Sequence, residues 1–226
     1  MKNIVLVILS LIFNSCGAFK IHDKHELIDF EDNQVPDNNL KLNGYYFAEL
    51  EREAQSFDQI QGAKIKYLSV FFIYEDGFVI NISGVDGLTE YYCAKKMTFD
   101  NTYASAHEAI ELMLESQKSE ESRIRRICGF EPHDIGNKGV AKISNDSIKI
   151  QFYRIEKQKP RIDSFNSAYL YEINGIIKSD SGFVIKNEIE FRTNKTTVEN
   201  TVFQFRRTEQ KPDIDNYFIK NIDRFK

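Results

Sequence analysis

The chain has 226 residues, of which 42% are apolar and 28% are charged, a composition typical of a globular domain and too apolar for a disordered chain. Its formal net charge of −4 argues against a general nucleic-acid-binding protein, because neutralising phosphates requires concentrated lysine and arginine. With 18 Phe, 11 Tyr and no Trp, the aromatic content is high.

The first stretch of the chain, residues 1–15, has the pattern of an export signal. Lys2 gives a positive start, residues 4–13 form an apolar run broken only by Ser10, and small and polar residues follow. At 1.5 Å of rise per residue this run covers roughly 15 Å, about half of a bilayer core, so it is too short for a comfortable transmembrane span. We therefore expect residues 1–15 to be a signal peptide and the rest of the chain to be exported.

The apolar run ends close to Cys16. The sequence Phe13-Asn14-Ser15-Cys16 resembles the lipobox of bacterial lipoproteins. This resemblance implies cleavage before Cys16, lipidation of its thiol with palmitate-type chains, and a lipid anchor that holds the protein in the bacterial cell envelope, on the periplasmic or the cell-surface side. The alternative is a secreted protein that is cleaved after Ala18 and loses Cys16.

Residues 16–40 are polar and irregular. They contain few apolar side chains and no sustained period of two or of 3.6 residues. Such a composition is typical of a linker, so we expect a flexible tether over residues 16–40.

Alternation of apolar and polar residues begins at Leu42 and predicts one β domain over residues 41–210. The strongest hairpin turn is Asp76-Gly77, because Gly tolerates the positive φ of a tight turn. About eight strands are expected, over residues 42–50, 66–74, 78–83, 140–143, 148–155, 168–177, 183–192 and 201–206. Strands with one apolar and one polar face are typical of antiparallel sheets, and eight in succession close naturally into an up-and-down barrel.

The layout of residues 42–208 resembles the lipocalin-like group of barrels, in which a segment such as Leu42-Asn43-Gly44-Tyr45-Tyr46 opens the first strand. The resemblance implies a mainly β fold, an antiparallel up-and-down barrel, and a role among tethered bacterial lipoproteins of unassigned function. An open sheet or a sandwich is the alternative fold.

A helical pattern interrupts the strands at about residues 85–138. Apolar residues recur at helical spacing and predict an amphipathic helix over residues 105–117, namely Ala106, Ala109, Ile110 and Met113. His107 lies on the predicted helix, where we expect a surface or rim residue.

The last segment, residues 211–226, begins with a strand-ending proline, Pro212. Five apolar residues then follow at near-helical spacing, namely Ile214, Tyr217, Phe218, Ile222 and Phe225. An isolated helix this short is marginal in water, so we expect a short C-terminal helix that forms by docking on the barrel. A frayed terminus is the alternative.

Two cysteines lie within the predicted domain, Cys93 and Cys128. In an oxidising envelope an even pair indicates a disulfide, and two separate thiols are the alternative. A zinc site that joins both cysteines with His133 is a weaker possibility.

No catalytic or cofactor motif is present in the sequence, which has no nucleophile elbow, phosphate loop or His-Glu-x-x-His. We therefore expect no cofactor and no metal, and name no catalytic residue. A hydrolytic enzyme ranks third among the functions considered.

Aromatic strand positions suggest the leading function. They are the candidates for lining a ligand site, namely Tyr46, Phe71, Phe78, Phe152, Phe183 and Phe203. We expect a membrane-tethered envelope lipoprotein whose barrel binds a small apolar ligand without catalysis. The alternative is an interaction or assembly protein of the envelope, with a solid core and a protein partner.

Overall fold

The structure of the protein is a computed structural model, and it describes residues 20–36, 39–55, 62–88, 100–124, 135–156 and 167–226. The strands are β1 (Lys20–Ile21), β2 (Gly44–Glu53), β3 (Lys64–Ile73), β4 (Phe78–Asp86), β5 (Lys138–Ser144), β6 (Ser147–Glu156), β7 (Ser167–Ser179), β8 (Gly182–Glu190) and β9 (Lys195–Arg207). The α-helices are α2 (Tyr103–Ser116) and α4 (Tyr217–Lys220), and the 3₁₀ helices are η1 (Lys24–Glu26) and η2 (Ile222–Arg224).

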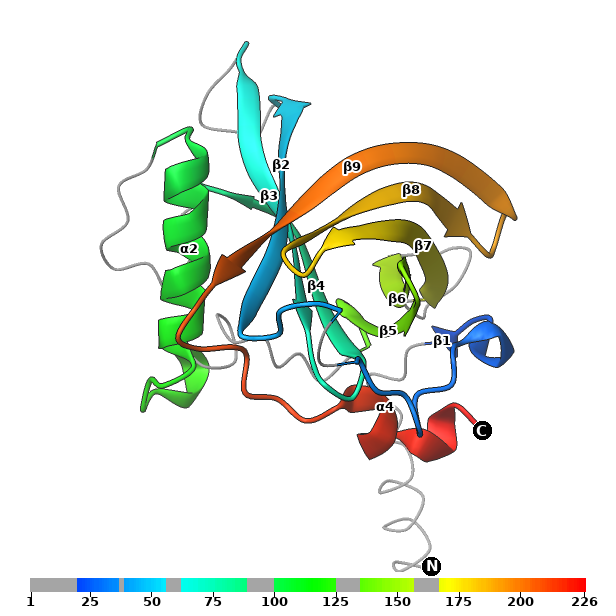
Figure 1. The fold of residues 1–226 in the computed structure, drawn as a ribbon. Helices are drawn as coiled ribbons and strands as arrows, with labels where there is room; N and C mark the ends of the chain where they lie inside the picture. Colours follow the sequence, from blue (N-terminus) through cyan, green and yellow to red (C-terminus); the bar gives the residue numbers. More distant parts are fainter. Residues whose placement is uncertain (1–19, 37–38, 56–61, 89–99, 125–134, 157–166) are drawn as a thin grey trace, which may run out of the picture.

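These strands form one sheet in the order β1-β7-β6-β5-β4-β3-β2-β9-β8, and β7 also pairs with β8. The additional pairing joins the two ends of the sheet, so strands β2 to β9 form a closed antiparallel barrel (Figure 1). Consecutive strands are neighbours in the barrel, which confirms the predicted up-and-down topology. In the turn between β3 and β4, Gly77 has a φ of +76°, as the Asp76-Gly77 pattern predicts.

The connection between β4 and β5 carries α2, which confirms the helical insertion. Thr102 caps its N-terminus, since its side chain accepts a hydrogen bond of 3.1 Å from the backbone N–H of Ser105. One side of α2 packs on the outside of the barrel through apolar residues that include Ala106, Ile110 and Leu114. Figure 1 shows α2 standing beside β2 and β3.

Apolar side chains gather on both sides of the barrel wall. The interior cluster has members from all of strands β2 to β9 and consists of Val35, Leu40, Tyr46, Ala48, Phe71, Ile73, Val79, Ala141, Ile148, Ile150, Phe152, Tyr169, Tyr171, Ile173, Phe183, Ile185 and Phe203. The outer cluster lies between the wall and the segments that cover it, and it includes Tyr45, Phe72, Phe78, Ile110, Tyr153, Leu170 and Phe218. Because alternate residues of a strand point to opposite sides, strands β2 to β7 are apolar on both faces where a helix or tail covers them.

The N-terminal segment differs from the expected flexible tether. Residues 20–36 and 39–40 pack on the barrel, with β1 paired to Ser167 and Ala168 of β7. Leu40 is only 2% exposed, and Val35 is buried with it against the interior cluster, so this segment covers one end of the barrel. A polar sequence can hold such a position because its few apolar side chains are buried and its backbone bonds to strand residues, as when Ile28 N–H donates to the Gln151 side chain at 2.6 Å.

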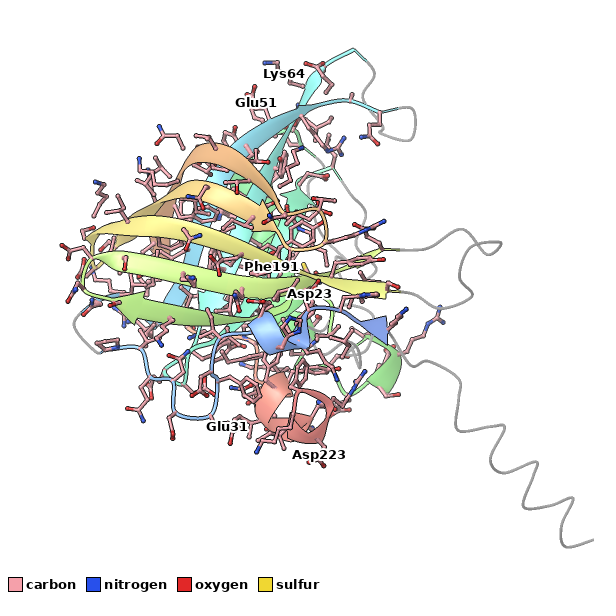
Figure 2. The ribbon with its side chains drawn as sticks, turned by 90° about the vertical axis from the view of Figure 1, so that its right-hand side faces the viewer. Asp23, Glu31, Glu51, Lys64, Phe191 and Asp223 are labelled. Carbon is pink, nitrogen blue, oxygen red and sulfur yellow. The ribbon has the colours of Figure 1, made fainter. Side chains whose placement is uncertain are left out.

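The C-terminal tail docks as predicted. Asn216 caps α4, and its side chain accepts hydrogen bonds from the backbone N–H groups of Phe218 and Ile219. Phe218 is fully buried, and its ring centroid lies 5.6 Å from that of Phe30 in the N-terminal segment. The two terminal segments therefore lie side by side below the barrel, where Figure 2 labels Glu31 and Asp223. At the opposite end of the same view, Glu51 and Lys64 mark the tips of β2 and β3.

Candidate ligand cavity at the open end of the barrel

A cavity of about 400 Å³ occupies one end of the barrel interior. Its apolar lining consists of Leu50, Phe71, Phe152, Ile173, Ile185 and Phe203, and its polar lining of Tyr67, Ser69, Asn81, Ser83, Arg154, Glu188, Glu199 and Thr201. The lining reaches toward the ends of β2, β6 and β8 at Leu50, Arg154 and Glu188 and toward the starts of β3 and β9 at Tyr67 and Glu199. These strand ends all lie at the same end of an up-and-down barrel. We call this the open end and the opposite one, under Val35 and Leu40, the closed end.

The six aromatic residues proposed as ligand lining take three different places. Phe71, Phe152 and Phe203 line the cavity. Tyr46 and Phe183 lie in the interior cluster toward the closed end, with ring centroids 5.2 Å apart. The ring of Phe183 stacks on that of Phe203 at 5.1 Å, so packed aromatic rings continue from the closed end to the cavity.

Phe78, the sixth candidate, does not face the interior. It belongs to the outer cluster and contacts the ring of Phe218 in the C-terminal helix, with centroids 6.4 Å apart. On β4 the inward positions near the open end are Asn81 and Ser83, so the more polar face of this strand points into the barrel. Phe78 is therefore a residue of the helix-covered outer wall.

Arg154 and Glu188 form an ion pair in the cavity lining. Two guanidinium nitrogens of Arg154 donate to the two carboxylate oxygens of Glu188 at 2.8 and 2.6 Å, a bidentate geometry that fixes both side chains. The same guanidinium lies 4.2 Å from the ring centroid of Tyr171. Since Arg154 comes from β6 and Glu188 from β8, the pair spans β7 and organises this side of the rim.

A register shift explains why Glu188 faces inward. The ladder between β8 and β9 is irregular between Ile185 and Asn187, and the ladder with β7 shifts at the same level. Glu188 then lies directly opposite Ile173, and both line the cavity. Regular alternation from Ile185 would have turned Glu188 outward, so the bulge re-aims a charged side chain into the site.

Glu199 is the third charged residue of the lining. It is half-buried, and its carboxylate accepts a hydrogen bond of 3.2 Å from the hydroxyl of Thr201 on the same strand. Within the described ranges it has no ion-pair partner. One cationic and two anionic side chains therefore line the cavity.

The barrel wall is incomplete beside the cavity. In the described part of the chain, β2 and β9 pair from Gly44 with Arg207 to Phe47 with Gln204, and beyond this point the two strands diverge. Figure 1 shows β2 and β3 rising past the crossing with β9, which curves away. A second hollow of about 380 Å³ lies along this seam, and Leu50 and Thr201 belong to the linings of both the hollow and the cavity.

A comparison with protein-family models, with curated proteins and with solved structures finds no match to this chain.

The titratable groups with large pKa shifts include two that lie away from the cavity. His107 on α2 is buried rather than exposed, and burial beside Arg206 lowers its pKa to about 4. Its Nδ1 lies 2.8 Å from the hydroxyl of Tyr45. The expected surface or rim position of His107 is thus replaced by a position in the outer cluster under α2.

Lys211 lies at the closed end, beside a broad hollow of about 810 Å³. Its ammonium donates to the backbone carbonyls of Leu42 and Ile73 at 2.8 and 2.6 Å and sits 4.1 Å from the ring centroid of Tyr74. Burial lowers the pKa of Lys211 to about 8. Since two of its three N–H groups donate to these carbonyls, Lys211 ties the C-terminal tail to the closed end.

Three predicted covalent sites, Cys16, Cys93 and Cys128, lie outside the described residues, as does His133, and they stay predictions. Among the described side chains, no group of three or more His, Cys, Asp and Glu is arranged to hold a metal ion. None of the helices in the described ranges has the length and apolar character that crossing a bilayer requires.

Proposed function

We propose that the protein is a non-enzymatic barrel that binds a small ligand, with an apolar body, in the cavity at its open end. The observation that carries the proposal is the cavity itself, whose volume of about 400 Å³ lies between apolar rings and a polar rim. Ligand pockets typically measure about 300–1,000 Å³ and combine an apolar lining with a few polar groups that fix orientation. A solid barrel would leave no such space.

The lining favours a ligand with two ends. Phe71, Phe152 and Phe203 offer ring surface to an apolar body, which gains roughly 25 cal/mol for each Å² removed from water. Ser69, Ser83 and Thr201 offer hydroxyl groups to polar atoms nearer the rim.

An interaction or assembly role for a solid barrel is the second candidate function. Its support is the closed half of the interior, where Tyr46 packs against Phe183 and Phe205 with centroid distances of 5.2 and 5.4 Å. This half is filled with side chains, so it resembles a structural core. The cavity in the other half makes ligand binding the better proposal.

We further propose that a lipid on Cys16 anchors the barrel in the bacterial cell envelope. Lys20, the first residue of β1, is the fourth residue after Cys16, and a chain of that length spans at most about 15 Å. β1 lies on the start of β7, at the open end of the barrel. An anchor there would hold the cavity mouth close to the bilayer, where apolar ligands concentrate.

Native mass spectrometry of the full chain, purified from its own host, tests ligand binding. We expect a population of molecules that carries an added small-molecule mass, and we expect this mass to be lost when the barrel is denatured and refolded. A single population at the mass of the protein alone, together with no binding of any added apolar probe, would contradict the proposal.

A further inference from the structure

The charges in the cavity lining indicate the class of ligand. Arg154 and Glu188 neutralise each other through their bidentate pair, and the guanidinium is also covered by the ring of Tyr171. Glu199 adds a second carboxylate to the same lining. One positive and two negative charges leave a net charge of −1 on the wall of the cavity.

Glu199 is available to a ligand. Its described neighbours supply one hydrogen bond, from the hydroxyl of Thr201, and no cation. A carboxylate that is half removed from water interacts with a positive charge several times more strongly than it would in bulk water. A cationic group that enters the cavity would therefore gain an ion pair that the protein itself does not provide.

The aromatic lining favours the same sign of charge. Rings of Tyr67, Phe71, Phe152 and Phe203 surround the cavity, and the faces of aromatic rings attract cations. Arg154 already shows this preference, because its guanidinium lies 5.1 Å from the ring centroid of Phe152. An anion would meet the ring faces and Glu199, and Arg154, the one cationic side chain among the described lining residues, is held by Glu188.

We propose that the ligand is an amphiphilic cation, with an alkyl or aryl body among Phe71, Phe152 and Phe203 and an ammonium group at Glu199. This inference rests on the proposed function, since it assigns the charge of the ligand that the cavity binds. It adds that electrostatic complementarity selects the ligand, with Glu199 as the residue that determines specificity.

Calorimetric titration with three probes of one chain length tests the inference. Octylammonium, octanol and octanoate are titrated into the full chain in nanodiscs of zwitterionic lipid, and the heat from empty nanodiscs is subtracted. We expect octylammonium to bind about tenfold more tightly than octanol, with octanoate the weakest of the three.

Two variants, each of which removes one negative charge, distinguish an effect of the cavity from an effect of the overall charge of the protein. In Glu199→Gln, octylammonium should bind within about twofold of octanol, while octanol affinity stays as in the wild type and shows that the barrel is folded. Glu209→Gln, at an exposed position after β9, should keep the wild-type preference.

The outcomes distinguish the two proposals. If octanol binds and octylammonium binds no better, or if octanoate binds most tightly, the cation inference is overturned while the cavity stands as a ligand site. If Glu199→Gln keeps the full preference for octylammonium, the assigned role of Glu199 is overturned. If none of the three probes binds, both the cation inference and the proposed function fail.

Discussion

The hydroxyl of Tyr45 on β2 and Nδ1 of His107 on α2 lie 2.8 Å apart in the outer cluster, where they share a buried hydrogen bond. The same imidazole lies nearly perpendicular to the ring of Phe47, with an angle of 88° between the ring planes and centroids 4.6 Å apart. The hydrogen bond places a polar group in the apolar interface between α2 and the barrel wall and helps to hold α2 there. Changes at His107 should therefore show how strongly α2 is docked.

Acid should weaken the fold through His107. Burial and the positive charge of Arg206, which pairs with Glu111, lower the pKa of His107 to about 4 in the folded protein, against about 6.5 in an unfolded chain. Between these values the unfolded chain binds more protons, so the free energy of unfolding falls as the pH drops from about 6.5 to about 4. In His107→Leu we expect this fall in the free energy of unfolding to be smaller by about 2 kcal/mol. Urea denaturation at several pH values measures it in both proteins.

His25 provides the control for that measurement. Its side chain is 79% exposed, so His25→Leu should keep the full wild-type dependence on pH. Equal pH dependence in the wild type and in His107→Leu would show that His107 titrates as an exposed histidine does.

The C-terminal helix should stabilise the barrel through Phe218. This side chain is fully buried and its ring lies near those of Phe30, Phe78 and Phe225, so Phe218→Ala should lower the free energy of unfolding by about 3 kcal/mol. The next residue, Ile219, is 46% exposed, and Ile219→Ala should change the free energy of unfolding by less than about 1 kcal/mol.

Truncation after Pro212 tests the whole tail and should lower the melting temperature by several degrees. An unchanged melting curve would mean that the tail is not docked in solution.

The ion pair between Arg154 and Glu188 should influence which ligand charge the cavity prefers. Glu188→Gln removes the carboxylate that neutralises Arg154, so octanoate should bind about fivefold more tightly than to the wild type. Glu156→Gln is the matched control, because Glu156 pairs with Arg192 at 2.8 Å and neither residue lines the cavity. An equal increase in octanoate affinity in Glu188→Gln and Glu156→Gln would mean that the increase comes from the net charge of the protein and not from the loss of the ion pair.

Lipidation is tested separately from ligand binding. If Cys16 carries the lipid, Cys16→Ser should abolish metabolic labelling of the full chain with a palmitate analogue in its host. Cys93→Ser, which changes another cysteine in the same way, should keep the label. Labelling that survives in Cys16→Ser would refute the anchor and favour secretion without lipid.

The fold follows from local patterns in the sequence. Alternation along the strands, the Asp76-Gly77 turn and the short connections are enough to predict an up-and-down barrel, since each strand pairs with its neighbour in the chain. The packing of residues 20–36 could not be predicted in this way. It depends on isolated contacts such as Val35 against the interior cluster and β1 against β7, and neither produces a periodic signal.

The sequence predicts Phe71, Phe152 and Phe203 as lining residues, but the polar part of the cavity lining escaped prediction for a related reason. Sequence reasoning assigns the more apolar face of a strand to the interior, and on β4 this chooses Phe78 although Asn81 and Ser83 point inward. Glu188 and Glu199 have the pattern of solvent-facing residues, and the register shift in β8 that turns Glu188 inward leaves no mark in the sequence. Where a cavity has a polar lining, polar side chains face the interior, and this is the opposite of the alternation by which a sequence identifies the core side of a strand.

The central claim is that a small molecule binds inside the open end of the barrel, and filling the cavity tests it most directly. Thr201 points into the cavity, while Val198 on the same strand is 86% exposed and lines neither the cavity nor the hollow along the seam. Octanol affinity of the full chain in nanodiscs is compared by calorimetry between Thr201→Phe and Val198→Phe. We predict a loss of at least about tenfold in Thr201→Phe and wild-type affinity in Val198→Phe. Equal octanol binding in the two variants, both folded, would show that the interior of the barrel is not the binding site.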